Sequence, residues 1–178
     1  MKIDWLTGCA TALVTPFGKD GSIDDACFTK LCERQVKSGV KLLVPCGTTG
    51  ENVTMDEAER LHVIKMTVEV AHKRVKVIAG TGSNNTAATI DFTRKARELG
   101  ADAALVVAPY YNKPTQEGMF AHYAEIAKSV KKFPIMLYNV PSRTASNISA
   151  DTTLKLVEAF ENIVATKEAS GNFRKLCR

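Results

Sequence analysis

Short apolar runs recur about every thirty residues along the chain, and this repeat restricts the folds that it can adopt. Each run is apolar almost throughout, as expected for parallel strands that helices cover on both faces. Amphipathic segments separate the runs, so the sequence predicts a repeated βα unit. The six runs are residues 10–14, 41–46, 75–79, 103–108, 133–138 and 162–166.

The segments between these runs carry signals for the start and the end of helices. Thr54 and Glu57 have the spacing of a capping box, and Thr115 precedes another amphipathic segment. Gly39 and Gly100 each fall between a helical segment and the next strand, where a left-handed residue is expected. These residues predict two helix starts and two helix ends.

Two architectures accept six βα units. An open, doubly wound sheet has about this length, whereas a (β/α)₈ barrel takes about 250 residues. The chain has 178 residues, of which 45% are apolar, so we expect residues 1–178 to form a single domain with a substantial core. Spacing alone therefore favours the open sheet.

The charge, cysteine and histidine patterns argue against several functional classes. The net charge of +5 is spread over mixed-sign segments, and only 7% of residues are aromatic, so we expect no nucleic-acid partner. Five cysteines without a C-x-x-C pair predict a reduced protein, and His62, His72 and His122 lack metal-ligand spacing, so we expect solvated or partly packed histidines and no metal. No stretch resembles a signal peptide or a membrane helix, and we expect a cytoplasmic location without membrane contact.

Polar motifs follow four of the predicted strands. Gly47-Thr48-Thr49-Gly50-Glu51 follows the second strand, a Tyr110-Tyr111 pair follows the fourth, residues 138–144 follow the fifth, and Lys167 ends the sixth. In both candidate architectures, functional residues lie beyond the carboxyl ends of the strands. We therefore expect the four motifs to share one rim of the fold.

Lys167 ends an apolar run, and this position allows two interpretations. Burial disfavours the charged ammonium and leaves a neutral amine, which can attack a carbonyl carbon and form a Schiff base. Alternatively, Lys167 marks the exposed end of a strand. Tyr138, which ends the preceding strand, can either transfer protons during imine formation or be an ordinary strand-end tyrosine.

The loop at residues 47–51 can bind either a phosphate or a carboxylate. It lacks the lysine of a P-loop, and Gly80-Thr81-Gly82 lacks the third glycine of a dinucleotide motif, so the carboxylate of a small 2-oxo acid fits better. Arg143 offers a planar fork to a second carboxylate, unless it is an ordinary exposed arginine. The Tyr110-Tyr111 pair suits either the rim of a site or a contact between subunits.

Together these motifs resemble the 4-hydroxy-tetrahydrodipicolinate synthase (dihydrodipicolinate synthase) family of pyruvate-dependent class I aldolases. The resemblance rests on residues 47–51, 109–114, 138–144 and 167–172, and extends from about Gly8 to Asn172. It implies an α/β fold of the (β/α)₈ TIM-barrel family, here with about six βα units of an incomplete barrel. The four ordered motifs outweigh the open sheet that spacing alone favours.

The resemblance also implies roles for individual residues. Lys167 would form a covalent imine with pyruvate, so that no cofactor is needed. Tyr138 would act as the acid and base, with Thr48 and Tyr111 completing a proton relay. Thr49 would hold the pyruvate carboxylate.

Two further implications concern the second substrate and the assembly. Arg143 would bind the carboxylate of aspartate semialdehyde, which distinguishes this activity from that of related sugar-acid aldolases. The product would be 4-hydroxy-tetrahydrodipicolinate, on the diaminopimelate route to lysine. The family tyrosine that matches Tyr111 reaches the neighbouring subunit's site, so a homo-oligomer is expected.

Some features depart from the family pattern. Family members continue beyond the strand that ends in Lys167 and supply the last two barrel strands, so we expect a C-terminally truncated chain whose basic residues 173–178 do not close the barrel. The alternative function is an inactive fragment that retains self-association or pyruvate binding. At the inhibitor site of lysine-sensitive members, two positions match and three differ, which predicts weak or no feedback by lysine. The matching residues are Asn84 and Tyr110, and the differing ones are Glu57, Arg60 and Ala88.

Overall fold

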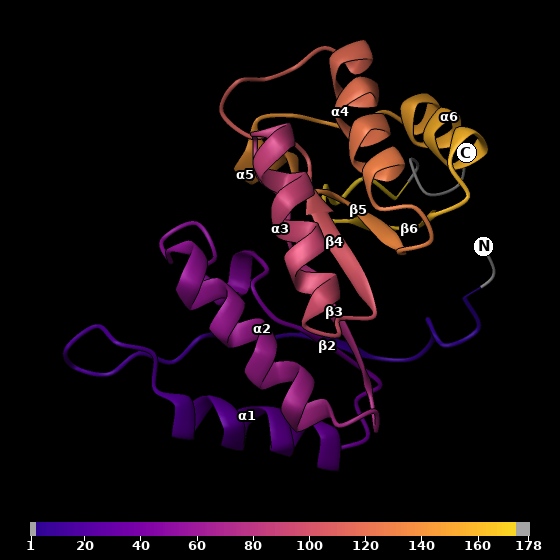
Figure 1. Cartoon of the computed structure of the whole chain (residues 1–178). Helices are drawn as coiled ribbons and strands as arrows, with labels where there is room; N and C mark the ends of the chain where they lie inside the picture. The colour runs from indigo at the N-terminus through magenta and orange to yellow at the C-terminus, as the bar shows by residue number, and fades with distance from the viewer. Residues whose placement is uncertain (1–2, 174–178) are drawn as a thin grey trace. The chain divides into compact units, whose positions relative to one another are not determined.

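The computed structural model describes residues 3–173, so Met1, Lys2, Cys177 and most of the basic C-terminal end lie outside the described residues. These residues divide into two compact units in which strands alternate with helices (Figure 1). The N-terminal unit comprises residues 3–80 and 95–103, and the C-terminal unit comprises residues 81–94 and those from 104 onward. A single domain stays a prediction.

Three parallel strands form the sheet of the N-terminal unit. They are β1 (Ala10–Ala12), β2 (Leu42–Val44) and β3 (Lys76–Gly80), with β2 in the middle, and Ala10 lies opposite Leu42, which lies opposite Lys76. The β2 side chains are buried on both faces of the sheet. Continuous burial explains why this run is apolar without alternation.

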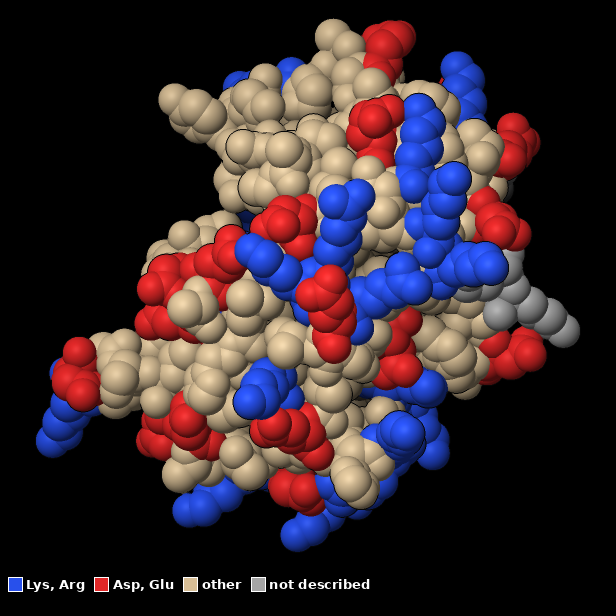
Figure 2. All heavy atoms as spheres, viewed as in Figure 1, with Lys and Arg blue, Asp and Glu red and all other residues tan. Residues whose placement is uncertain are grey.

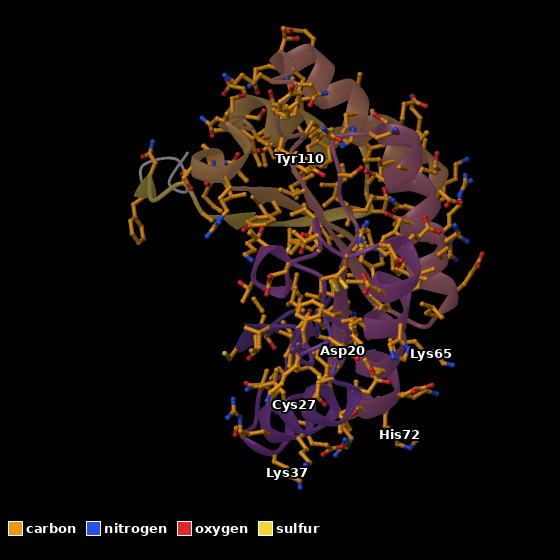
Figure 3. All side chains as sticks on the ribbon, turned by 90° about the vertical axis from the view of Figure 1, so that its left-hand side faces the viewer. Asp20, Cys27, Lys37, Lys65, His72 and Tyr110 are labelled. Carbon is orange, nitrogen blue, oxygen red and sulfur yellow. The ribbon has the colours of Figure 1, made fainter. Side chains whose placement is uncertain are left out.

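Two helices of the N-terminal unit pack against each other, α1 (Asp25–Lys37) and α2 (Glu57–Ala71). Their C-terminal ends, marked by Lys37 and His72, lie at the same end of the unit (Figure 3). An ion pair between Arg74 and Glu33 joins the two ends. Since both ionic groups are partly exposed, this pair adds little stability, and apolar packing accounts for most of the contact.

The C-terminal unit repeats the same pattern with longer strands. β4 (Ala103–Val107), β5 (Ile135–Asn139) and β6 (Ile163–Glu168) are parallel, and β5 lies between the other two. The helices are α3 (Thr86–Glu98), which ends in the N-terminal unit, α4 (Gln116–Ser129), α5 (Pro141–Thr144) and α6 (Ala150–Ala159). Helices α4 and α6 lie side by side (Figure 1), and the Tyr123 hydroxyl of α4 donates a 3.1 Å hydrogen bond to the Val106 carbonyl.

Most of the predicted helix ends are confirmed. Thr115 caps α4 by accepting a hydrogen bond from Gly118 N, and Gly39 and Gly100 follow α1 and α3 with φ angles of +83° and +96°. A residue with a side chain would be strained at these two positive angles, whereas glycine is not.

The capping box predicted at Thr54 and Glu57 is wrong. The cap of α2 is Asp56, whose carboxylate accepts from Glu59 N at 2.8 Å while the Glu59 carboxylate accepts from Asp56 N at 2.8 Å. The Thr54 hydroxyl instead donates to the Glu51 carbonyl within the preceding turn. Both pairs have the same spacing, and this turn decides between them by delaying the helix start.

Within residues 3–173, no helix has the length and apolar character of a membrane-spanning segment. The same residues contain no group of three or more His, Cys, Asp or Glu side chains arranged to hold a metal ion.

On the face that Figure 2 shows, Lys and Arg side chains are interspersed with Asp and Glu, in agreement with the mixed-sign segments of the sequence.

The loop after β2 lies very close to the end of β3. Gly80 N donates a 2.9 Å hydrogen bond to the Pro45 carbonyl, and a Cβ atom on Gly80 would lie only 1.9 Å from the Cys46 carbonyl oxygen. Thr15 holds the other end of the loop through a 2.8 Å hydrogen bond from its hydroxyl to the Gly50 carbonyl. Gly80 is therefore required because the two backbone segments lie so close together. This close contact, and not a dinucleotide motif, explains the glycine at this position.

Replacing Gly80 with alanine should lower the free energy of unfolding by about 1–3 kcal/mol, because the added methyl group meets rigid backbone. Chemical denaturation measures this change. Gly47→Ala is the matched control, since nothing lies within 4 Å of a Cβ at Gly47. Equal effects of the two substitutions would contradict the close approach.

His122 is buried in the C-terminal unit, so the expectation of a solvated or partly packed side chain is wrong for this residue. Only 6% of it is exposed, and its Nδ1 lies 2.8 Å from the Thr86 hydroxyl at the start of α3. Burial penalises the charged imidazolium and lowers the pKa of His122 to about 4. His122 lies on α4 and contacts Thr86 of α3, so its burial depends on an element distant in sequence, which a short sequence pattern does not indicate.

The unfolded chain should bind a proton at His122 near pH 6.5, whereas the folded chain does so only near pH 4. The stability contributed by the neutral ring is therefore complete above about pH 6.5 and is lost as the pH falls towards 4, by up to about 3 kcal/mol. Denaturation of the wild type and of His122→Asn over this pH range measures the contribution. The asparagine keeps a polar partner for Thr86 but does not titrate. Parallel stability curves for the two proteins would contradict the prediction.

Candidate active site

Tyr138 and Lys167 lie side by side at the carboxyl ends of β5 and β6. They are opposite each other in the parallel register, and Lys167 Nζ lies 4.3 Å from the centroid of the Tyr138 ring. Tyr138 is 6% exposed, and Lys167 is half-buried. The ring covers one side of the amine, while partial exposure leaves the amine accessible to a small molecule.

An irregularity in β6 produces this arrangement. Ile163 lies opposite Ile135, but the next pair joins Ala165 with Met136, so Val164 is an additional residue in β6. Partner residues in parallel strands point to the same face of the sheet, and successive residues point to opposite faces. The bulge therefore brings Lys167 to the same face as Tyr138.

Arg143 lies on the single turn of α5 that directly follows β5. Its side chain is exposed, whereas the next residue, Thr144, is buried and donates from its hydroxyl to the Val140 and Ser146 carbonyls. Ala145 ends this turn with a φ angle of +53°. The turn is thus fixed by internal hydrogen bonds and presents an available guanidinium group close in sequence to Tyr138.

The Tyr110-Tyr111 segment has an unusual backbone. Tyr111 has a φ angle of +74° and is 88% exposed. Its N–H donates a long 3.4 Å hydrogen bond to the Thr144 carbonyl, and the Asn84 side chain donates to the Tyr110 carbonyl at 3.3 Å. A left-handed aromatic residue costs about 1–2 kcal/mol, so the contacts on either side of Tyr111 must hold its backbone in this conformation.

Thr48 and Thr49 lie in the N-terminal unit, on the one-turn 3-10 helix Thr48–Gly50 that follows β2. Thr49 is exposed and Thr48 is half-buried. Positive φ angles at Cys46 and Glu51 bracket this turn, which begins with a hydrogen bond from Gly50 N to the Gly47 carbonyl. Both threonines thus follow the carboxyl end of a strand, and their approach to Lys167 stays a prediction.

Sequence reasoning missed two polar residues beside the lysine and the tyrosine. Asn139 is completely buried, and its side-chain nitrogen lies 2.9 Å and 3.0 Å from the two carboxylate oxygens of Glu168. Both residues directly follow a predicted site residue, and the signal available in the sequence was an asparagine at the end of an apolar strand. Buried polar groups need partners, so such an asparagine predicts a hydrogen-bond network.

The C-terminal unit combines an accessible amine, a phenol beside it and, on the turn that follows the phenol in sequence, an exposed guanidinium group. A primary amine can attack a carbonyl carbon, a phenol can move protons, and a guanidinium group can bind a carboxylate. This combination suits imine chemistry on small carboxylic acids.

Comparison with known proteins agrees with this chemistry. The model of the dihydrodipicolinate synthetase family matches residues 5–178. The 4-hydroxy-tetrahydrodipicolinate synthase of Syntrophotalea carbinolica is 49% identical over 93% of the chain and 56% of that protein. The structure of dihydrodipicolinate synthase from Bacillus anthracis is 51% identical, with a TM-score of 0.93 over 98% of this chain and 59% of that one.

A third similar structure is the dihydrodipicolinate synthase of Acinetobacter baumannii in complex with pyruvate, with 48% identity and a TM-score of 0.92 over 94% of this chain and 57% of that one. The chain thus spans less than three fifths of the length of these relatives. The expected TIM-barrel class with six βα units is confirmed, and the open doubly wound sheet is wrong. The chain belongs to the dihydrodipicolinate synthetase family of lyases.

Proposed function

We propose that this chain carries the pyruvate-binding half of a 4-hydroxy-tetrahydrodipicolinate synthase, with Lys167 as the residue that forms the Schiff base. The observation that supports this most is the position of Lys167 Nζ, 4.3 Å from the Tyr138 ring centroid in a half-buried setting. Family membership and the pyruvate complex of the Acinetobacter relative also support a pyruvate site in this chain.

In the proposed reaction, the neutral Lys167 amine attacks the keto carbon of pyruvate to give a carbinolamine. Loss of water then yields the imine, and the Tyr138 phenol donates and accepts the protons that these steps require. Removal of a methyl proton converts the imine to an enamine, whose carbon attacks the aldehyde of aspartate semialdehyde. The amino group of aspartate semialdehyde then attacks the imine carbon, which closes the ring and releases the Lys167 amine. The chemistry needs no cofactor, because the imine itself withdraws electrons.

The other site residues act in this proposal as binding and relay groups. Thr49 binds the pyruvate carboxylate, and Thr48 and Tyr111 extend the proton relay from Tyr138. Arg143 binds the carboxylate of aspartate semialdehyde, and its exposed position on α5 suits a group that selects the second substrate. A related sugar-acid aldolase would have less use for this guanidinium group.

The strained and 88% exposed Tyr111 suits a contact with a second copy of the chain, so we propose a homo-oligomer in which this residue crosses to a neighbouring site. The cysteine pattern of the sequence supports a reducing, cytoplasmic environment.

Borohydride should trap the proposed imine. Incubation of the full chain with pyruvate and sodium borohydride should add one carboxyethyl group to Lys167, because hydride reduces the imine carbon. Intact mass and tandem mass spectrometry measure the adduct and its position, and Lys167→Ala should remain unmodified. Failure to form an adduct in a folded chain would refute pyruvate chemistry in this polypeptide and favour an inactive fragment.

Replacing Tyr138 with phenylalanine removes the hydroxyl group and keeps the aromatic ring, so it distinguishes proton transfer from covering of the amine. The ring should still cover Lys167, but proton transfer is lost, so trapping should slow by about two to four orders of magnitude. A time course of the adduct, with folding checked by circular dichroism, gives the rate. An unchanged rate would exclude Tyr138 as the acid and base while leaving the Lys167 imine intact.

A further inference from the structure

We infer that Asn139 and Glu168 form a register lock, a side-chain pair that fixes the bulged strand β6 against β5 and so keeps Lys167 beside Tyr138. The structural role of the lock is independent of the proposed function. Only its effect on catalysis rests on that function. Both members are positioning residues, because their side chains face away from the amine and the phenol that they align.

The bulge makes a second register available to β6. If the pairing of Ile135 with Ile163 continued without the additional Val164, Lys167 would lie opposite Asn139 instead of Tyr138. A shift by one residue moves every following side chain to the other face of the sheet. The amine would then point away from Tyr138, although the strands would still pair.

Asn139 is the centre of the contacts that oppose this shift. Its Nδ2 donates to the Asn147 side-chain oxygen at 2.9 Å and to the two Glu168 carboxylate oxygens at 2.9 Å and 3.0 Å. Its Oδ1 accepts from Ile148 N at 2.9 Å, and its carbonyl accepts from Ala169 N at 2.8 Å. The side chain therefore joins β5, the segment before α6 and the end of β6.

Glu168 extends the lock beyond β6. Its Oε1 also accepts from Ser170 N at 2.9 Å, so the turn after the strand is held by the same carboxylate. In the alternative register, Glu168 would move away from its present partner position. Asn139 is completely buried, so loss of Glu168 would leave only its contacts to Asn147 and Ile148 and one Nδ2 hydrogen without an acceptor, which makes that register unfavourable.

The chemistry of the pair is directional, because an amide donates to a carboxylate. Asn139→Asp places two carboxylates against each other and removes the donor. The exchanged double variant Asn139→Asp with Glu168→Gln restores one donor and one acceptor and keeps the net charge of the wild type. Asn172→Asp adds the same charge at an exposed position nearby and serves as the control for charge alone.

Hydrogen exchange of the full chain tests the lock without any substrate. In Asn139→Asp, the amides of Ala169 and Ser170 should exchange at least about tenfold faster, because repulsion between the two carboxylates displaces Glu168 and the end of β6, where these amides form their hydrogen bonds. The exchanged double variant should recover most of the protection, and Asn172→Asp should match the wild type. Unchanged exchange in Asn139→Asp, or no recovery in the double variant, would refute the lock.

A second readout follows the amine itself. Trace labelling with acetic anhydride from neutral to alkaline pH, analysed by peptide mass spectrometry, gives a curve of Lys167 acetylation against pH whether or not pyruvate reacts. Asn139→Asp should change this curve, the exchanged double variant should restore it, and Asn172→Asp should leave it as in the wild type. If the curves behave as expected but the wild type does not trap pyruvate, the proposed function is refuted and the lock is not. Equal curves in all four proteins would refute the lock.

Discussion

The parallel pairing of β5 with β6 determines which side chains of the C-terminal unit can act together. A bulge at Val164 shifts the second half of β6 by one residue, which places Lys167 opposite Tyr138 and Glu168 opposite Asn139. One pair provides an amine and a phenol, and the other provides a buried hydrogen-bond network on the opposite face. The same register thus supports both chemistry and stability.

Loops at the carboxyl ends of the strands are shaped by backbone constraints. Gly80 permits the close approach of β3 to the Cys46 carbonyl, and Gly82 does the same against Val107 N in the C-terminal unit, where an added Cβ would lie 2.4 Å away. Cys46 and Tyr111 adopt left-handed angles without being glycine. Such strain persists where the surroundings fix the backbone, as they commonly do at functional sites.

Sequence reasoning found the strands, the fold family and the motifs, because continuous apolar runs and ordered polar motifs are local signals. It identified Lys167 and Tyr138 but not their pairing, since the bulge at Val164 depends on contacts between strands. It placed the α2 cap two residues early, at Thr54 instead of Asp56, because two pairs share the same spacing. His122 and Asn139 were not recognised as buried polar residues, because burial depends on elements distant in sequence.

A crystal structure of the chain after reaction with pyruvate and borohydride tests the central claim most directly. We expect a carboxyethyl group on Lys167 Nζ, with Tyr138 facing the same side of the sheet and Val164 unpaired in β6. Modification at another lysine, or a regular β6 in which Lys167 lies opposite Asn139, would contradict the account.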